Sequence, residues 1–153
     1  MDAGAGPNAE PGPPGLQTPR GVVEAWAASW NHLRFDRMAD LWDAEDPEAT
    51  YIGDEIRDPL HGLLEIREHL DRTAGRVVAA EVTLAGLRAR TLAPDVALAT
   101  FLCSWALTTV EVAEPYRTHT MVTLVLRRRP PGWRIAHYAE SPRHLVGDTT
   151  APS

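Results

Sequence analysis

The first half of the chain carries its apolar residues at helical spacing. One stripe repeats every three or four residues, as in an amphipathic helix, and comprises Val22, Val23, Trp26, Ala27, Trp30 and Leu33. Thr18 and Pro19 mark its start, because a hydroxyl N-cap precedes a proline whose missing N–H group costs nothing in the first helical turn. Asp36 begins a shorter helix that runs to Trp42, and a third helix follows Gly62.

The second half changes to the two-residue period of β-strands. Apolar residues alternate in two segments, at Val78, Ala80, Val82 and Leu84 and at Val122, Leu124 and Leu126. The run Val96–Val110 is rich in Val, Thr, Phe and Trp, which is typical of a central strand. Turns at Pro94-Asp95 and Pro130-Pro131 separate these strands, and Glu48–Ile52 forms a short strand before them. The order predicts an α+β fold in which three N-terminal helices cover one face of an antiparallel sheet.

The pairing within the last hairpin decides which side chains face the core. If Pro130 and Pro131 form its tip, Leu126 lies opposite Ile135 and Leu124 lies opposite His137. One face is then apolar and holds Val122, Leu124, Leu126, Trp133, Ile135 and His137. The opposite face holds His119, Met121, Thr123, Arg134, Tyr138 and Glu140. This register predicts a buried His137 that cannot share a metal ion with His119.

The composition excludes several classes of protein. The chain has 153 residues, of which 44% are hydrophobic and 24% charged, with a net charge of −6, and this length suffices for one self-sufficient core. The single cysteine, Cys103, excludes a disulfide framework, and the acidic balance argues against a nucleic-acid partner. Val96–Val110 is too short and too polar to span a membrane, and Met1–Ala9 lacks the apolar core of a secretion signal. We therefore expect a cytoplasmic protein with one domain.

The two ends of the chain set the limits of this domain. Residues 1–17 are rich in proline and glycine and offer little apolar surface besides Leu16. Such a segment cannot bury enough surface to offset the entropy of ordering it, so we expect it to be disordered. The tail 147–153 has the same character. The folded domain is therefore predicted to span residues 18–146.

The closing hairpin resembles that of a known superfamily. It combines Arg117-Thr118-His119-Thr120, an arginine-rich turn and the segment Gly132–Pro142, and so resembles the last hairpin of SnoaL-like proteins of the NTF2-like superfamily. The same hairpin shape occurs in the association domain of calcium/calmodulin-dependent kinase. The segment from Ala49 to Gly62, with the helix after it, is similar to the strand–loop–helix element of the family. The resemblance implies a cone, in which a curved sheet wraps over three helices around a mostly apolar pocket.

Proteins of this superfamily use the pocket for isomerisation, for aldol-type cyclisation of polyketides, for epoxide opening or for no chemistry. Aligned with ketosteroid-isomerase-like members, the catalytic aspartate falls on Gly53, the oxyanion-hole tyrosine near Trp26 and the second oxyanion-hole carboxyl within Val122–Leu124. These departures argue against steroid-type isomerisation. Two hypotheses stay open: a general acid–base enzyme that cyclises or isomerises a hydrophobic, polyketide-like intermediate, and a non-catalytic ligand-binding or dimerisation module.

Three residues are candidates for acid–base chemistry. Asp54 lies where the pocket mouth is expected, and a carboxyl group beside apolar walls has a raised pKa and could act as a base. The alternative is a solvated loop acid beside Glu55 and Asp58. His137 is either the proton carrier of the pocket or a core histidine bonded to the backbone. Tyr51 either directs its hydroxyl into the pocket or anchors the short strand.

The candidates for substrate binding are large apolar side chains, which form either the core or a cavity wall: Trp26, Trp30, Trp105, Leu124 and Trp133. Neither an i, i+4 histidine pair nor an HExxH motif occurs, so the sequence proposes neither a metal nor a cofactor. The expected partners are a hydrophobic small molecule and a second copy of the chain. The resemblance implies that homodimer, and its interface is expected on the outer sheet face at Met121, Thr123, Ala136 and Tyr138.

Overall fold

The computed structural model describes residues 15–144, and the predictions for residues 1–14 and 145–153 lie outside this range. The helices are α1 (Pro19–Asn31), α2 (Phe35–Ala39) and α3 (Leu63–Ala74). The strands are β1 (Thr50–Ile52), β2 (Leu60–His61), β3 (Val77–Ala93), β4 (Val96–Thr109), β5 (Tyr116–Arg129) and β6 (Gly132–Pro142). This order confirms the α+β class, with the helices ahead of the four long strands. No helix within the described range is long and apolar enough to cross a membrane.

The first helix begins as the sequence predicts. The Thr18 hydroxyl accepts a hydrogen bond from the Gly21 N–H at 3.0 Å, and Pro19 occupies the first helical position. Helix α2 is shorter than expected, because it ends at Ala39 and leaves Trp42 in the following segment. That segment forms a single parallel bridge from Trp42 to Ile135 of strand β6, which places it at the edge of the sheet.

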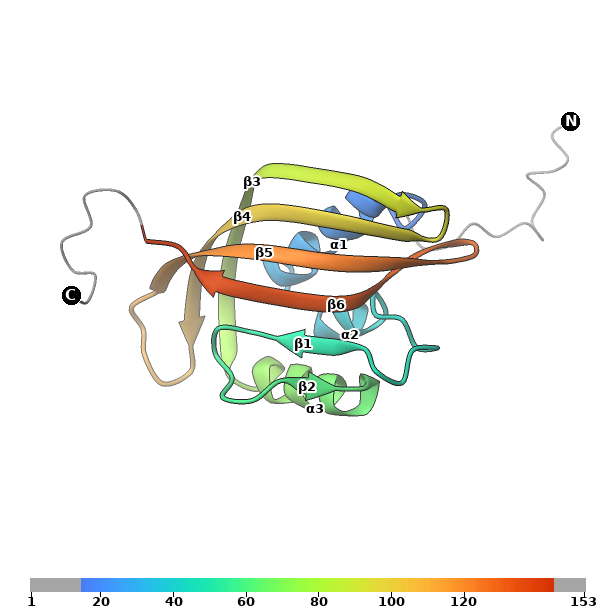
Figure 1. Ribbon diagram of the computed structural model, residues 1–153. Helices are drawn as coiled ribbons and strands as arrows, with labels where there is room; N and C mark the ends of the chain where they lie inside the picture. Colours follow the sequence, from blue (N-terminus) through green and yellow to red (C-terminus); the bar gives the residue numbers. More distant parts are fainter. Residues whose placement is uncertain (1–14, 145–153) are drawn as a thin grey trace, which may run out of the picture.

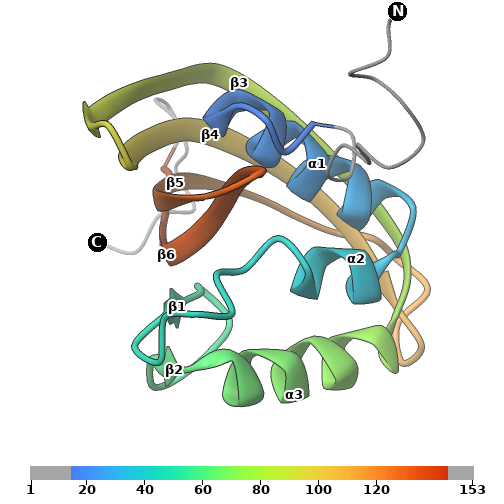
Figure 2. The ribbon, with the colours of Figure 1, turned by 90° about the vertical axis from the view of Figure 1, so that its right-hand side faces the viewer.

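The six strands form one curved sheet in the order β2-β1-β6-β5-β4-β3. The four long strands pair antiparallel, as predicted, whereas β1 joins β6 in parallel. Strand β3 bends sharply (Figure 1), and its pairing with β4 shifts between Ala85 and Arg88, where Gly86 has a φ of +64°. Only glycine adopts this conformation readily, so Gly86 permits the bend. The long strands curve over α1, and α3 lies on the far side of the molecule (Figure 2).

Aromatic side chains fill the space between α1 and the sheet. The Trp26 ring lies 5.5 Å from the rings of Phe101 and Trp105 and 5.7 Å from that of Tyr138. Trp30 stands edge-on to Trp105 at 5.1 Å between ring centroids. These offset and edge-to-face contacts add to the burial of large apolar surfaces. The core is therefore continuous from α1 through β4 to β6.

The predicted register of the last hairpin is confirmed near the turn and wrong beyond it. Leu126 pairs with Ile135 as expected, but Val125 then pairs with His137 and Leu124 with Tyr138. Ala136 is an extra residue in β6, and such a β-bulge exchanges the two faces of the strand after it. His137 therefore lies on the outer face, while Tyr138 and Glu140 turn inward. The burial pattern agrees, since Tyr138 is 1% exposed.

The predicted start of the folded part is also too late. Leu16, which was expected to lie in a disordered segment, is 1% exposed and belongs to the core. Its carbonyl oxygen accepts a hydrogen bond from the Trp133 N–H at 2.7 Å. The close approach of the Leu16 backbone at Gly132 leaves no room for a Cβ atom there. One apolar side chain and one backbone hydrogen bond thus attach residues 15–17 to the last hairpin.

Candidate functional site

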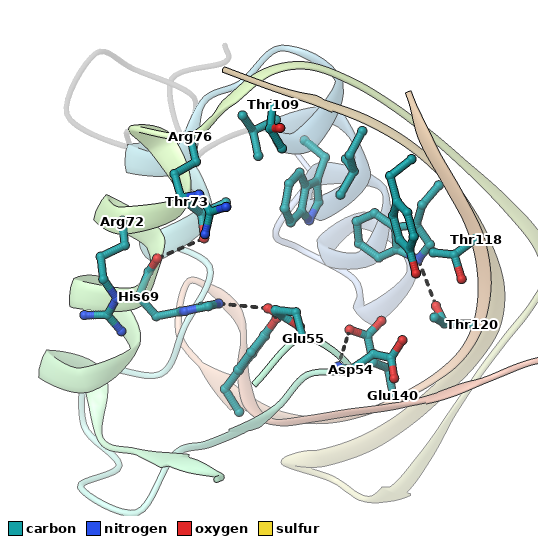
Figure 3. A pocket seen from close by; sticks show the side chains of 16 residues that line it. Asp54, Glu55, His69, Arg72, Thr73, Arg76, Thr109, Thr118, Thr120 and Glu140 are labelled. Atoms are coloured by element: carbon teal, nitrogen blue, oxygen red, sulfur yellow. Dashed lines mark hydrogen bonds and ion pairs between the residues drawn. The ribbon is translucent and has the colours of Figure 1, made fainter. Parts of the chain in front are cut away.

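A cavity of about 520 Å³ lies between α3 and the inner face of the sheet. Its walls come from α1, α3, β1, the β1–β2 loop and strands β3 to β6 (Figure 3). Trp30, Trp105 and Leu107 give it an apolar side. Three acidic residues line the same cavity: Asp54, Glu55 and Glu140. A cavity of this size, mostly apolar with a few convergent polar groups, is typical of a small-molecule site.

Glu140 reaches the cavity because of the bulge in β6. Its Oε1 atom accepts a hydrogen bond from the Asp54 N–H at 2.9 Å, and its Oε2 atom accepts one from the Tyr138 hydroxyl at 3.0 Å. Burial raises the pKa of the Glu140 carboxyl above its ordinary value, and the negative charge of Glu55 acts in the same direction. These effects outweigh the hydrogen bonds, which favour the ionised form. A carboxyl group of this kind is suited to accept and return a proton.

Glu55 joins two further groups at the cavity. The Nε2 atom of His69, on α3, lies 2.8 Å from Glu55 Oε2, and the Tyr51 hydroxyl donates a hydrogen bond to the same oxygen. Partial burial alone would raise the pKa of the Glu55 carboxyl, but the hydrogen bonds from His69 and Tyr51 outweigh it and hold the pKa below the ordinary value. Glu55 is therefore an ionised anchor. We call the Tyr51–Glu55–His69 chain the Glu55 network.

Two tyrosines connect the Glu55 network to Glu140. Tyr51 of β1 pairs in register with Tyr138 of β6, and their rings stack with centroids 4.9 Å apart and planes 13° from parallel. Burial raises the pKa of both hydroxyls well above the ordinary value, and the neighbouring carboxylates raise it further. Both tyrosines therefore stay protonated and act as hydrogen-bond donors. Each donates to a different glutamate.

The structure brings together only some of the residues that the sequence singled out. Tyr51, Asp54, Trp30 and Trp105 line the cavity, and Asp54 contributes its backbone N–H to Glu140 as well as an exposed side chain. The other candidates do not line it. Trp26, Leu124 and Trp133 are buried core residues, at 3%, 0% and 7% exposure. His137 is on the opposite face of the sheet because of the bulge.

Sequence reasoning missed Glu140, Glu55 and His69. Glu140 was assigned to the outer face by the uninterrupted register, and Glu55 was considered only as a neighbour of Asp54. One signal for the bulge is present, because Ile135 and Ala136 are consecutive apolar residues that break the alternation of β6. His69 has no such signal, since it approaches Glu55 only when α3 packs beside the β1–β2 loop. Among residues 15–144, no three His, Cys, Asp or Glu side chains gather as a metal site would require.

The fold is an α+β cone that encloses a cavity of about 520 Å³ between α3 and the sheet. The sequence matches the SnoaL-like domain family over residues 20–144, and the chain belongs to this family. No curated protein matches the chain in sequence. The cone predicted from the closing hairpin is confirmed.

Solved structures of the same fold lie at low sequence identity. An NTF2-like superfamily protein from Salmonella enterica superposes with a TM-score of 0.71 at 18% identity, over 86% of this chain and 92% of that one. A proposed dehydratase of the NTF2-like family from Streptomyces avermitilis gives 0.69 at 16% identity, over 81% and 93%. A proposed calcium/calmodulin-dependent kinase type II association domain from Thiobacillus denitrificans gives 0.64 at 22% identity, over 86% and 100%. At these identities the likeness shows the fold alone.

Proposed function

We propose that this protein is an enzyme that moves a proton on a hydrophobic small molecule by general acid–base chemistry. The reaction class is cyclisation or isomerisation of a carbonyl-bearing, polyketide-like biosynthetic intermediate. One observation carries the proposal: Glu140 and Glu55 lie at one cavity, and their surroundings shift the two pKa values in opposite directions. When two acids of one site have pKa values shifted in opposite directions, one can accept a proton while the other stays ionised as a fixed charge.

Glu140 is the proposed general base. Its raised pKa brings the carboxylate closer in basicity to a carbon acid and to working pH, which is the condition for efficient proton transfer. The Tyr138 hydroxyl and the Asp54 N–H hold the carboxyl group in one orientation. The proton leaves the substrate carbon next to a carbonyl group, and Glu140 returns it to a different carbon or to the product oxygen. His137, outside the cavity, has no part in this proposal.

The Glu55 network is the proposed electrophilic side of the site. When a proton is removed beside a carbonyl group, negative charge develops on the carbonyl oxygen and needs a hydrogen-bond donor. Tyr51 supplies a hydroxyl that stays protonated, and its single O–H turns from Glu55 Oε2 to the substrate oxygen as the charge develops there, while His69 keeps its contact with Glu55. Trp30 and Trp105 exclude water from the apolar side of the substrate. The proposed base, Glu140, and the proposed donor, Tyr51, both line the cavity.

Exchange of carbon-bound hydrogen tests the proposal without knowledge of the natural substrate. We expect the protein to accelerate deuterium exchange at the α-carbons of 2-tetralone in D₂O, followed by NMR. Glu140→Gln should lower the protein-catalysed rate by about 10²-fold. Asp58→Asn is the matched control, because Asp58 is exposed on the same loop as Glu55 and does not line the cavity.

Equal exchange rates for the native protein and Glu140→Gln, or no exchange above the buffer rate, would contradict the enzyme proposal. Binding of 2-tetralone without exchange would then favour the alternative, a non-catalytic ligand-binding module. Calorimetry on the same samples separates these two outcomes. Melting temperatures of all variants show whether a lost rate reflects lost chemistry or lost folding.

We also propose that two copies of the chain pair through the outer face of the sheet. Of the residues expected there, Met121 and Thr123 are exposed on that face, and Met121 is 45% exposed. Leu98, Leu102 and Val125 lie beside them, half-buried. Tyr138 does not contribute, since it turns inward after the bulge. An apolar strip on a sheet face that no helix of residues 15–144 covers supports such an interface.

A further inference from the structure

Side chains of both charges line the cavity. Arg72, in the last turn of α3, and Arg76, just after it, line one side. Asp54, Glu55 and Glu140 line another side, contributed by the β1–β2 loop and by β6. Figure 3 shows Arg76 on the α3 wall with Glu140 across the cavity from it, and Arg72 on the same helix with its guanidinium group on the side away from Glu140. Glu55 lies near the α3 wall, since its Oε2 atom is 2.8 Å from His69 Nε2, so a ligand that fills the cavity meets the arginines at one end and Glu140 at the other.

The rest of the lining mixes apolar side chains with hydroxyl groups. Trp30, Val77, Trp105 and Leu107 are its apolar members, and the hydroxyl groups, besides that of Tyr51, belong to Thr73, Thr109, Tyr116, Thr118 and Thr120. A cavity of about 520 Å³ accommodates a ligand with several rings. A ligand that spans this cavity therefore offers apolar rings to the tryptophans and a different polar group to each charged wall.

The two arginines are available for a ligand. Arg76 makes an ion pair with Glu111 at 3.2 Å, but the side chains are 66% and 51% exposed, and exposed pairs of this kind contribute little stability. Exchanging Glu111 for a ligand carboxylate therefore costs little. Arg72 has no hydrogen bond or ion pair from its side chain to another residue within 15–144. A guanidinium group presents a planar fork of donors that matches a carboxylate group.

We propose that the substrate carries a carboxylate group, bound by Arg72 and Arg76, at the end remote from the reacting carbon. This inference rests on the proposed function, since it assumes that the acid end of the cavity is where proton transfer occurs. It adds a substrate class: apolar, ring-containing carboxylic acids. Without these arginines, three acidic residues and a net charge of −6 would disfavour any anionic ligand.

A pair of ligands that differ only in charge tests this inference. We expect 2-naphthoate to bind the protein at least about fivefold more tightly than 2-naphthamide, measured by calorimetry at neutral pH and low salt, where guanidinium–carboxylate attraction is least screened. The double variant Arg72→Gln/Arg76→Gln should reduce this preference to less than about twofold. Arg67→Gln is the matched control, because Arg67 is an exposed arginine on the same helix, contacts Asp40 and lines a different cavity.

Tighter binding of the naphthoate that is lost only in the double variant supports the inference. Equal binding of the two ligands, tighter binding of the amide, no binding of either, or a preference that survives the double substitution overturns it. The 2-tetralone experiment is independent, because that ketone is uncharged and its exchange depends on Glu140. Failure of the carboxylate preference with intact exchange therefore overturns the substrate class alone, whereas loss of exchange overturns the proposed function.

Discussion

Burial and hydrogen bonding act in opposite directions on Glu140 and Glu55, and the balance differs between them. The folded-state pKa of Glu140 is raised above the ordinary 4.5, so the folded protein holds that proton more tightly than the unfolded chain does. This favours folding at low pH, and the benefit is lost as the pH rises through the raised value. The folded-state pKa of Glu55 is lowered, so its contribution is present above 4.5 and lost as the pH falls through the lowered value.

Glutamine variants at the two positions should therefore change stability with opposite pH dependence. Relative to the native protein, the melting temperature of Glu140→Gln should rise as the pH increases above about 4.5, because the variant has no buried charge to form. Glu55→Gln should instead lose melting temperature relative to the native protein as the pH rises toward about 4.5 and should stay lower above it, since it cannot form the charged hydrogen bonds to His69 and Tyr51. Thermal unfolding from about pH 3 to about pH 8 measures both. Parallel pH curves for the two variants would contradict these assignments.

At the scale of elements, the Asn31 side chain connects α1 to the edge strand β3 by two hydrogen bonds. The Asn31 Nδ2 atom donates to the Val82 carbonyl oxygen at 3.1 Å, and the Val82 N–H donates to Asn31 Oδ1 at 2.7 Å. Val82 is 6% exposed, so neither backbone group has ready access to water. The amide of Asn31 thus replaces the missing neighbour strand at this point of the sheet edge.

Asn31→Ala should lower the free energy of unfolding by about 2–3 kcal/mol, because two backbone groups at a buried position lose their partners. Urea unfolding followed by tryptophan fluorescence measures this loss. Asn31→Asp is the informative companion, since it keeps the acceptor for the Val82 N–H and removes the donor to the Val82 carbonyl. A loss below about 0.5 kcal/mol for the alanine variant would mean that water replaces the amide.

The helices and the meander could be predicted because local patterns determine them. Thr18 and Pro19 specify the start of α1 within a few residues of sequence, alternating apolar residues specify β3 and β5, and a run rich in Val, Thr, Phe and Trp specifies β4. The bulge in β6 depends on a distant segment instead. Ile135 donates to the Leu41 carbonyl at 2.8 Å and its own carbonyl accepts from the Asp43 N–H at 2.8 Å. The partners in these contacts lie more than ninety residues apart in the sequence, and the contacts stand beside the change of register in β6.

Only part of the candidate site could be predicted, because local patterns show some of its residues and long-range contacts place the others. Tyr51 and Asp54 follow from the position of a short strand and its loop, which a local pattern shows. Glu140 depends on the bulge, and His69 depends on how α3 packs beside that loop. Both positions depend on tertiary packing, which the two-residue period of strands and the 3.6-residue period of helices do not reveal. The residues that best account for chemistry are therefore those that the chain brings together over long distances.

At the scale of the whole molecule, helices pack on only one of the two faces of the sheet within residues 15–144. The inner face holds the helices, the core and the cavity, whereas the outer face, toward the viewer in Figure 1, carries no helix of the described chain. Met121 lies on this outer face. A symmetric dimer through this face would bring each apolar strip against its own copy.

Met121→Glu should convert a dimer into a monomer, because a symmetric interface would then bury two like charges close together. Light scattering after size exclusion at micromolar concentration should give twice the mass of the chain for the native protein and the single mass for the variant. Leu64→Glu is the control, since Leu64 is 74% exposed on α3, away from the sheet. A native protein of single-chain mass would refute the dimer and leave the cavity chemistry untouched.

The central claim is that the pKa values of Glu140 and Glu55 are shifted in opposite directions. NMR titration of the native protein, labelled with ¹³C at the glutamate carboxyl carbons, tests it most directly. Glu140→Gln and Glu55→Gln assign the two signals by their absence. We predict that the Glu140 signal titrates above the ordinary pKa of 4.5 and the Glu55 signal below it. Two signals that both titrate close to 4.5, or in the reverse order, would contradict the assignment of Glu140 as the general base.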